Sequence, residues 1–138
     1  MNLAGRIFLI LAATLLLVSL FTIYRRYEQR TQQQREAKYE RALASYSHIF
    51  QLGETREEVE NYLSVREVKY ERMCCLDERS AFADLLRIGE EQAPWLCSEQ
   101  TIYIAFQFAA VEPHDASPAY PSDVLRKINI YRQLSGCL

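Results

Sequence analysis

The sequence predicts an α+β protein in which an N-terminal transmembrane helix and a helical stalk precede two short helices packed on a three- to four-stranded antiparallel sheet. Three observations lead to this prediction. The chain opens with an uncharged apolar run, continues with apolar residues at helical spacing, and ends with apolar residues in alternation. Helical and strand periods that occupy separate parts of a chain are typical of α+β domains. We therefore expect an anchor over residues 1–24, a stalk over 25–38 and a small folded domain over 39–138.

The run IFLILAATLLLVSLFTIY, residues 7–24, has the composition of a membrane-spanning helix. Its eighteen residues include no charge, Gly or Pro, and twelve are Leu, Ile, Val or Phe. Such a helix is about 27 Å long, close to the hydrocarbon thickness of a bilayer. A cleaved secretory signal is the main alternative, but the run ends in bulky and basic residues where a small-residue cleavage site is required. The sequence therefore predicts a single-pass protein of the inner or plasma membrane, with residues 7–24 in the lipid bilayer.

Charge divides the remainder of the chain. Residues 25–52 carry six basic and three acidic groups, whereas residues 53–138 carry nine basic and fifteen acidic groups. The segment RRYEQRTQQQREAKYERAL lacks Gly and Pro and shows little apolar periodicity before Tyr39, which is typical of a solvated helical stalk. Its first arginines, Arg25 and Arg26, are placed to meet lipid headgroups.

The folded domain is expected to begin with two helices. The first carries one apolar stripe at three- and four-residue steps, formed by Tyr39, Ala42, Leu43, Tyr46, Ile49 and Phe50. Gly53 is a helix stop, and Thr55 with Glu58 forms a capping box that opens the second helix. Val59, Tyr62 and Leu63 share one face of that second helix.

Strand signals follow the helices. The first strand places Val68, Tyr70 and Cys74 on one side and Lys69, Glu71, Met73 and Cys75 on the other. In SAFADLLRIGEE, a strand that leads into a hairpin at Gly89 is favoured over a helical turn. The strongest strand has Ile102, Ile104, Phe106 and Phe108 on one face, with Tyr103 and Gln107 on the other. The proline-rich EPHDASPAYPSD is a loop, and VLRKINIYRQL is a closing strand that follows a bulge.

The string LGETREEVENYL, with Gly53, Thr55, Val59 and Leu63, resembles the SmpA/OmlA (BamE) family of small bacterial envelope domains. The resemblance implies a two-helix start packed on a three-stranded antiparallel sheet over residues 39–135, and a protein-binding role. Two features of that family are missing here. The Gly-x-Pro turn after the second helix is absent from LSVREVKY, and a protein anchor replaces the lipidated cysteine.

Two signals disagree about the side of the membrane that the domain occupies. Basic residues are concentrated after the apolar run, including Arg25, Arg26 and Arg30, and the positive-inside rule places such a flank in the cytoplasm. All four cysteines fall in the folded part, an even number that suits an oxidising compartment. We expect an extracytoplasmic, periplasmic domain with disulfides; a cytoplasmic adaptor with free thiols is the alternative.

The disulfide candidates are Cys74, Cys75, Cys97 and Cys137. Because adjacent strand residues point to opposite faces, Cys74 and Cys75 are not expected to bond to each other. Each would then pair with Cys97 or Cys137, in one of two arrangements. A metal site is disfavoured because the short cysteine pairs of zinc sites are absent and both histidines stand alone. No cofactor is predicted.

The sequence offers little support for catalysis. His48 lies beside the apolar stripe of the first helix, where packing or surface exposure explains it. The pair His114 and Asp115, with Ser117 nearby, is the basis of an alternative function, a small membrane-bound hydrolase. The acidic groups of EEVE and the pair Glu90 and Glu91 are interpreted as solvated faces. The chain has only four glycines, no phosphate-binding loop and no basic nucleic-acid patch.

The aromatic residues indicate binding to another protein. Nine tyrosines and one tryptophan are many for the core of so small a domain, and exposed Tyr or Trp is typical of interaction hot spots. Trp95 and Tyr120 occupy hairpin or loop positions where a partner could be met. The sequence therefore predicts a single-pass membrane protein whose α+β domain binds or scaffolds an unidentified protein partner.

Overall fold

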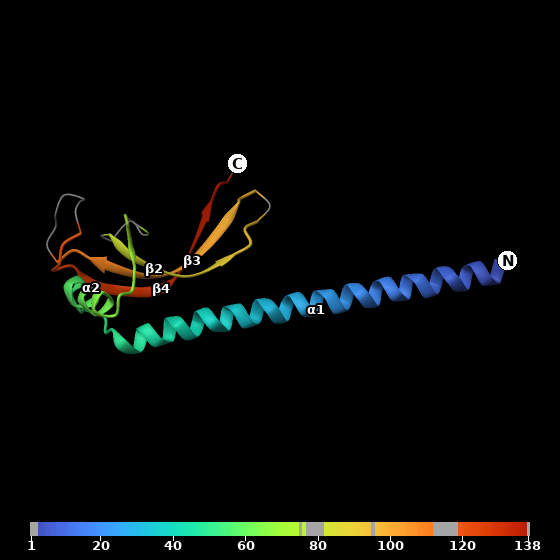
Figure 1. The fold of residues 1–138 in the computed structure, drawn as a ribbon, viewed down its shortest axis with the longest axis horizontal. Coiled ribbons are helices and arrows are strands. Elements are labelled where there is room, and N and C mark those ends of the chain that lie inside the picture. Colours follow the sequence, from blue (N-terminus) through green and yellow to red (C-terminus); the bar gives the residue numbers. More distant parts are fainter. Residues whose placement is uncertain (1–2, 75, 77–81, 95, 112–118, 138) are drawn as a thin grey trace. The chain divides into compact units, whose positions relative to one another are not determined.

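The computed structural model describes residues 3–74, 76, 82–94, 96–111 and 119–137, with side chains from residue 9 onward. The elements in order are α1 (Leu3–Ile49), α2 (Arg56–Val65), β1 (Glu71–Met73), β2 (Ala83–Glu91), β3 (Glu99–Ala109) and β4 (Val124–Ser135) (Figure 1). They confirm the predicted α+β class. The chain divides into two compact units, residues 1–38 and residues 39–138.

Helix α1 joins three segments that the sequence analysis treated separately. The expected anchor, stalk and first domain helix form one helix of 47 residues. After Gly5 this stretch contains neither Gly nor Pro, so no residue within it breaks the hydrogen-bond ladder. The domain therefore begins with the last turns of a long helix and contains one complete short helix, α2.

The end of α1 contributes the predicted stripe to the core of the second unit. Tyr39 and Phe50 are buried, and Ala42, Leu43 and Tyr46 pack against the same cluster. The assignment of Ile49 to this stripe was wrong, because its side chain is 39% exposed. The helix ends at Ile49, and Phe50 leaves it to enter the core in edge-to-face contact with Tyr62 and Phe106.

Helix α2 begins at the predicted capping box. The Thr55 amide donates to Glu58 Oε2 at 2.8 Å, and the Glu58 amide donates to Thr55 Oγ1 at 3.3 Å. These two bonds satisfy donors that a helix start leaves without partners. Gly53 precedes the cap with a φ of 98°, a left-handed conformation that glycine adopts without strain. Val59 and Leu63 are buried, as their shared helix face predicts.

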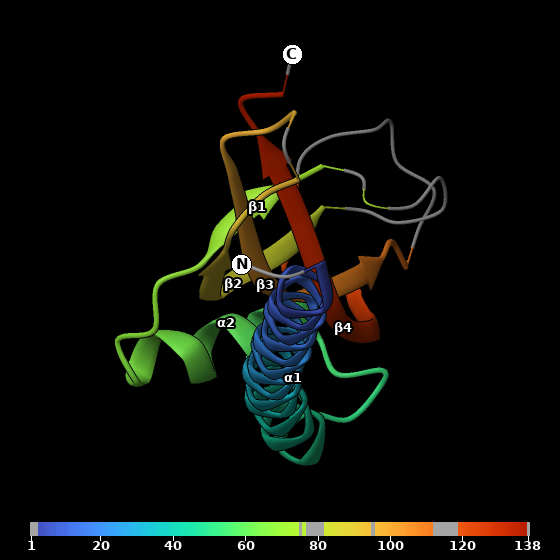
Figure 2. The same ribbon diagram turned by 90° about the vertical axis from the view of Figure 1, so that its right-hand side faces the viewer.

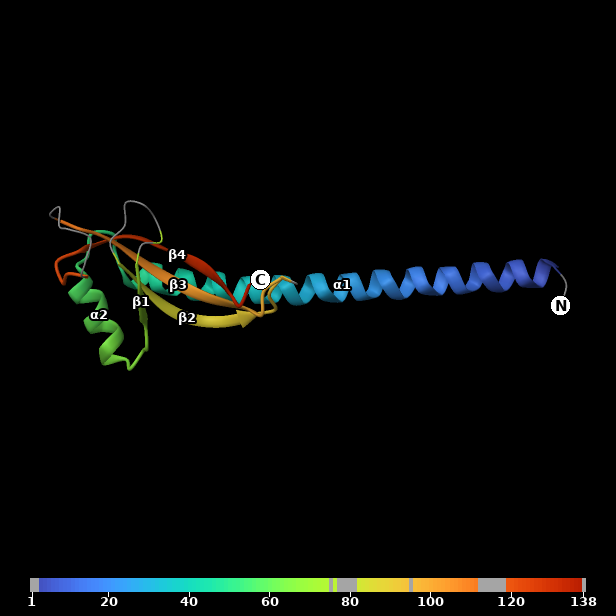
Figure 3. The same ribbon diagram turned by 90° about the horizontal axis from the view of Figure 1, so that it is seen from above.

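The four strands form one antiparallel sheet in the order β1-β2-β3-β4. The long strands β3 and β4 run side by side (Figure 2). Helix α2 lies at the end of the sheet where β3 ends and β4 begins (Figure 3), and an isolated bridge joins Thr55 to Val124 there. Strand β1 is shorter than expected: it covers Glu71–Met73, so Val68, Tyr70 and Cys74 lie outside it.

Strand β3 has apolar residues on both faces. Ile104, Phe106 and Phe108 belong to the main cluster beneath α1 and α2, which confirms the predicted face. Tyr103 and Ala105, on the opposite face, form a second cluster with Ala83 and Leu85 of β2.

The predicted bulge in β4 is also present. Phe108 pairs with Leu125 and Gln107 pairs with Lys127, which leaves Arg126 as the extra residue. Because of this shift Leu125 and Ile128 both reach the main cluster.

Candidate functional site

The densest group of charges in the described residues lies between α2 and the sheet. It consists of Arg56, Glu60, Arg72, Asp84 and Asp123, and is called here the Arg56 cluster. Arg56 Nη1 donates to Asp84 Oδ1 at 2.7 Å, and Arg56 Nε lies 3.5 Å from Asp123 Oδ2. Arg72 Nη2 donates to Glu60 Oε1 at 2.6 Å and extends the network to a surface edge.

Arg56 joins three segments that are distant in the sequence. It is the first residue of α2, Asp84 belongs to β2, and Asp123 precedes β4. Its Nη2 donates to the backbone carbonyl of Phe82, and its guanidinium lies 4.0 Å from the ring centroid of Phe108. The Arg56 amide donates to the Asp123 carbonyl at 2.7 Å. Arg56 therefore ties the start of α2 to the sheet, in addition to the apolar packing of Val59 and Leu63.

The inner part of the cluster is enclosed, whereas Arg72 at its edge is 46% exposed. The side chains of Arg56, Asp84 and Asp123 are 1%, 0% and 1% exposed. A group sealed in this way has no access for a substrate, so its chemistry is that of a buried salt bridge between elements. Three of its atoms, Arg56 Nε, Asp84 Oδ2 and Asp123 Oδ1, have no hydrogen-bond partner among the described residues. Because these buried atoms already lack hydrogen-bond partners, the loss of a further contact of Arg56, Asp84 or Asp123 would lower the free energy of unfolding.

This cluster was not predicted from the sequence, although one signal was present. A basic residue in the first turn of a helix is repelled by the partial positive charge at the helix N-terminus. Arg56 in that position therefore required a specific anionic partner, but the partner residues are 28 and 67 positions away and no local pattern identifies them. The interpretation of EEVE as wholly solvated is wrong for Glu60, which bonds to Arg72.

Burial controls the titration of Asp84. Loss of solvent raises the pKa of this carboxyl from 3.8 to about 6, although Arg56 opposes the shift. A carboxyl whose pKa is higher in the folded state holds its proton more tightly there than in the unfolded chain. The contribution of Asp84 to stability therefore increases as pH falls from about 7 towards 4, by up to about 3 kcal/mol for a shift of about two units.

We expect this contribution to disappear in the variant Asp84→Asn. Because asparagine does not titrate, the free energy of unfolding of the wild-type chain should rise relative to that of the variant as pH falls from 7 to 5. Denaturant titration of the full chain in detergent micelles, followed by near-ultraviolet circular dichroism, measures it. Glu90→Gln, an exposed carboxyl paired with Arg87, is the control. A shift of the opposite sign would mean that attraction to Arg56 outweighs desolvation.

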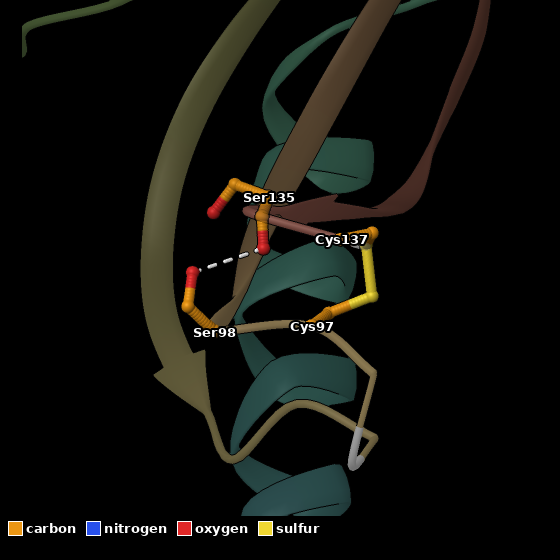
Figure 4. Close-up of a disulfide and its surroundings, with 4 residues drawn as sticks. All are labelled: Cys97, Ser98, Ser135 and Cys137. Atoms are coloured by element: carbon orange, nitrogen blue, oxygen red, sulfur yellow. Dashed lines mark hydrogen bonds between the residues drawn. A yellow bond between two sulfur atoms is a disulfide. The ribbon is translucent and has the colours of Figure 1, made fainter.

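A disulfide closes the far end of the β3–β4 pair. Cys97 precedes β3 and Cys137 follows β4, and their sulfurs are bonded (Figure 4). Beside them the Ser98 hydroxyl donates to the Ser135 carbonyl at 3.1 Å. Closing a loop with a sequence separation of 40 residues contributes up to about 4 kcal/mol in the chain-entropy model. The bond fixes the C-terminus to the start of the central strand.

The predicted cysteine pairing was wrong, and the strand register explains why. Glu99 pairs with Ser135, so the two residues just beyond this pair, Cys97 and Cys137, meet. Met73 pairs with Ala83, which pairs with Gln107, so β1 adjoins the opposite end of β3. Gln107 is eight residues along β3 from its start at Glu99, about 26 Å at 3.3 Å per residue, and Cys97 lies beyond that start.

Cys74 is disulfide-bonded as well, and none of the described cysteines is free. Because β1 ends at Met73, the argument from alternating strand faces does not apply to Cys74. Cys75 lies outside the described residues.

Other predicted site residues are only partly placed. His48 is exposed on α1, in keeping with a surface role. Tyr120 is half-buried in the turn before β4, where its amide donates to Asp123 Oδ2 at 2.9 Å. Trp95, His114, Asp115 and Ser117 lie outside the described residues. The structure therefore brings Tyr120 next to the Arg56 cluster, which the sequence did not predict.

One surface hollow of the second unit combines apolar and basic side chains. It lies between the end of α1 and the start of β4, and is called here the β4 depression. Its lining residues are Ser47, Phe50, Leu52, Arg126, Lys127 and Ile128. Leu52 is 68% exposed, and Arg126 and Lys127 are also exposed.

No protein-family model matches the sequence, and searches of curated proteins and of solved structures returned no match.

The apolar stretch of α1 is the other unusual surface. The helix is long and apolar enough to cross a membrane, and none of its apolar window is buried within the protein. Leu15, Leu16 and Phe21 are each more than half exposed, with fractions of 68%, 65% and 58%. Soluble monomers rarely expose contiguous apolar surface of this extent.

Proposed function

We propose that this chain is a single-pass membrane protein that presents a small α+β binding domain on the extracytoplasmic side of the inner or plasma membrane. The observation that carries the proposal is the uncovered apolar stretch of α1. A helical stretch that is apolar on all sides and has none of its apolar window buried within the protein is expected to have lipid around it. Arg25, Arg26 and Arg30 follow the apolar run within the same helix, at positions suited to lipid headgroups.

The disulfides support the extracytoplasmic side. Cys97 and Cys137 are bonded, and Cys74 is also oxidised. Structural disulfides persist in oxidising compartments and are rare in the cytosol. This chemical argument opposes the basic flank of the helix, and we give it more weight because the β3–β4 register itself brings Cys97 and Cys137 together.

A binding role is favoured over an enzymatic one by the nature of the charged groups. Arg56, Asp84 and Asp123 of the Arg56 cluster are buried, whereas the β4 depression is open and mixes apolar with basic side chains. The proposal includes the resemblance at Gly53, Thr55, Val59 and Leu63 to the SmpA/OmlA (BamE) domains, and it assigns a protein-binding role to the same kind of scaffold.

Thiol labelling of intact cells tests the proposed topology. A membrane-impermeant maleimide is applied before and after reduction with an impermeant phosphine, and the full-length protein is analysed by gel shift. We expect modification only after reduction and without permeabilisation, because the cysteines are oxidised and face outward. A cytosolic thiol protein, which must stay unmodified, controls for membrane integrity.

Two results would contradict the proposal. Modification that requires permeabilisation but no reduction would place free thiols in the cytoplasm. A mature polypeptide truncated near Arg25, detected by intact mass, would identify the apolar run as a cleaved signal.

A further inference from the structure

The floor of the β4 depression is apolar and open. Leu52 follows α1 in the turn that contains Gly53, and its side chain is 68% exposed. Phe50 and Ile128, which belong to the main cluster or pack against it, line the same hollow. An apolar side chain from another molecule placed here would remove Leu52 from water and extend the existing core.

Two cations border this floor. Arg126 and Lys127 are exposed, and within the described part of the chain no carboxylate lies within ion-pair distance of either. They are consecutive residues of β4, and the bulge at Arg126 places both opposite Gln107. Residues 53–138 carry an excess of acidic groups, so a basic border is unusual on this domain. Its charge complements carboxylates of a ligand.

The outer edge of β4 is available beside the depression. Leu125 directs both backbone groups away from β3, since its amide donates to the Glu54 carbonyl and its carbonyl accepts from the Gly53 amide, each at 2.7 Å. At the bulge, Arg126 and Lys127 both lie opposite Gln107 of β3. Ile128 is therefore the next residue of β4 whose backbone N–H and C=O point away from β3. No described residue bonds to that side of Ile128.

The open edge is short. Asn129 Nδ2 donates to the Ile130 carbonyl at 3.0 Å, and its Oδ1 accepts from Gln107 Nε2 at 2.7 Å. The Asn129 side chain thus occupies the Ile130 carbonyl, which is the next carbonyl that points away from β3. A partner strand is therefore limited to pairing with Ile128 and with the Ile130 amide. The Gly53–Thr55 segment closes the edge at the other end. The gap between these two limits coincides with the β4 depression.

We propose that the β4 depression binds an extended acidic segment of a partner protein, which pairs with Ile128 at the β4 edge, places an apolar side chain on Leu52 and Phe50, and directs carboxylates to Arg126 and Lys127. Main-chain pairing at an open strand edge supplies affinity, and alternate side chains supply specificity. This inference deepens the proposed function, on which it rests, by naming the binding surface and the chemistry of the partner.

Fluorescence anisotropy with the full chain in detergent micelles tests the inference. The probe is a labelled peptide of alternating valine and aspartate, and the comparison peptide alternates valine and lysine. We expect saturable binding of the acidic peptide only, weakened about tenfold by Lys127→Glu through lost attraction and new repulsion. Lys69→Glu makes the same substitution at an exposed position outside the depression and should leave affinity within about twofold.

The apolar contact has its own matched pair. Leu52→Asn should weaken binding of the acidic peptide about tenfold, whereas Val65→Asn, at a position that is 82% exposed on α2, should have no effect. Circular dichroism of each variant establishes that the fold is retained.

Three outcomes with the peptides would overturn the inference: no binding of the acidic peptide, equal binding of both peptides, or equal effects of Lys127→Glu and Lys69→Glu.

A separate titration tests whether the depression binds a lipid headgroup instead of a peptide. Phosphatidylglycerol is added to the micelles, with phosphatidylcholine as control. Lys127-dependent binding of that lipid without peptide binding would also overturn the inference. Binding in micelles does not depend on which side of a membrane the domain occupies, so failure here is separate from failure of the topology test.

Discussion

Replacing Arg56 with methionine is expected to lower the free energy of unfolding by about 3–5 kcal/mol. The variant keeps most of the side-chain volume over Phe108 but leaves the carboxyls of Asp84 and Asp123, which are 0% and 1% exposed, without their cation. A buried carboxylate without a partner must either remain desolvated or take up a proton. Denaturant titration of the full chain in micelles measures the loss.

Two further variants identify the cause of that loss. Arg87→Met removes an exposed arginine that pairs with Glu90, and should lower stability by less than about 1 kcal/mol. Adding Asp84→Asn to Arg56→Met replaces a buried charge with a neutral amide, and should recover part of the loss at neutral pH. Equal effects of Arg56→Met and Arg87→Met would show that the Arg56 cluster does not hold α2 to the sheet.

Replacing Leu15 and Leu16 with arginine is expected to release the protein from the membrane. Arginine in the centre of a spanning helix disfavours insertion by about 2.5–3.5 kcal/mol and leucine favours it, so the double variant shifts apparent insertion by about 6–8 kcal/mol. Both leucines lie in the uncovered part of α1, at 68% and 65% exposure. Fractionation with carbonate extraction measures the distribution between membrane and soluble fractions.

The matched control places the same charges elsewhere on the same helix. Gln32→Arg with Gln33→Arg adds two arginines in the polar part of α1 and should leave the protein in the membrane fraction. If the Leu15 and Leu16 variant also stayed there after carbonate extraction, the apolar run would not be what holds the protein in the membrane.

Several elements could be predicted because their signals are local. The capping box of Thr55 and Glu58, the alternation through β3 and the bulge in β4 each depend on residues a few positions apart. Ile49, the last residue of α1, was misassigned because a residue at helical spacing can still lie at the margin of the buried stripe, where its side chain remains 39% exposed. Strand β1 was overextended for a related reason, since alternation in sequence does not reveal how far a partner strand reaches.

The candidate surfaces are formed by residues that are distant in the sequence, and no local pattern encodes contacts between such residues. Leu52 and Arg126 belong to the same depression only because the segment after α1 pairs with the start of β4. Neither residue was singled out in the sequence, where one is an apolar residue near a turn and the other a charge in a strand.

From the amino-acid order alone, this chain was assigned a long apolar helix, a capped second helix and a set of antiparallel strands, because helix period, caps and strand alternation are properties of neighbouring residues. The folded arrangement alone established that Cys97 meets Cys137, that Arg56 is buried against Asp84 and Asp123, and that an apolar hollow with two cations opens beside β4. These depend on strand register, since a shift of a single residue would separate the cysteines and turn every side chain of β4 to the other face.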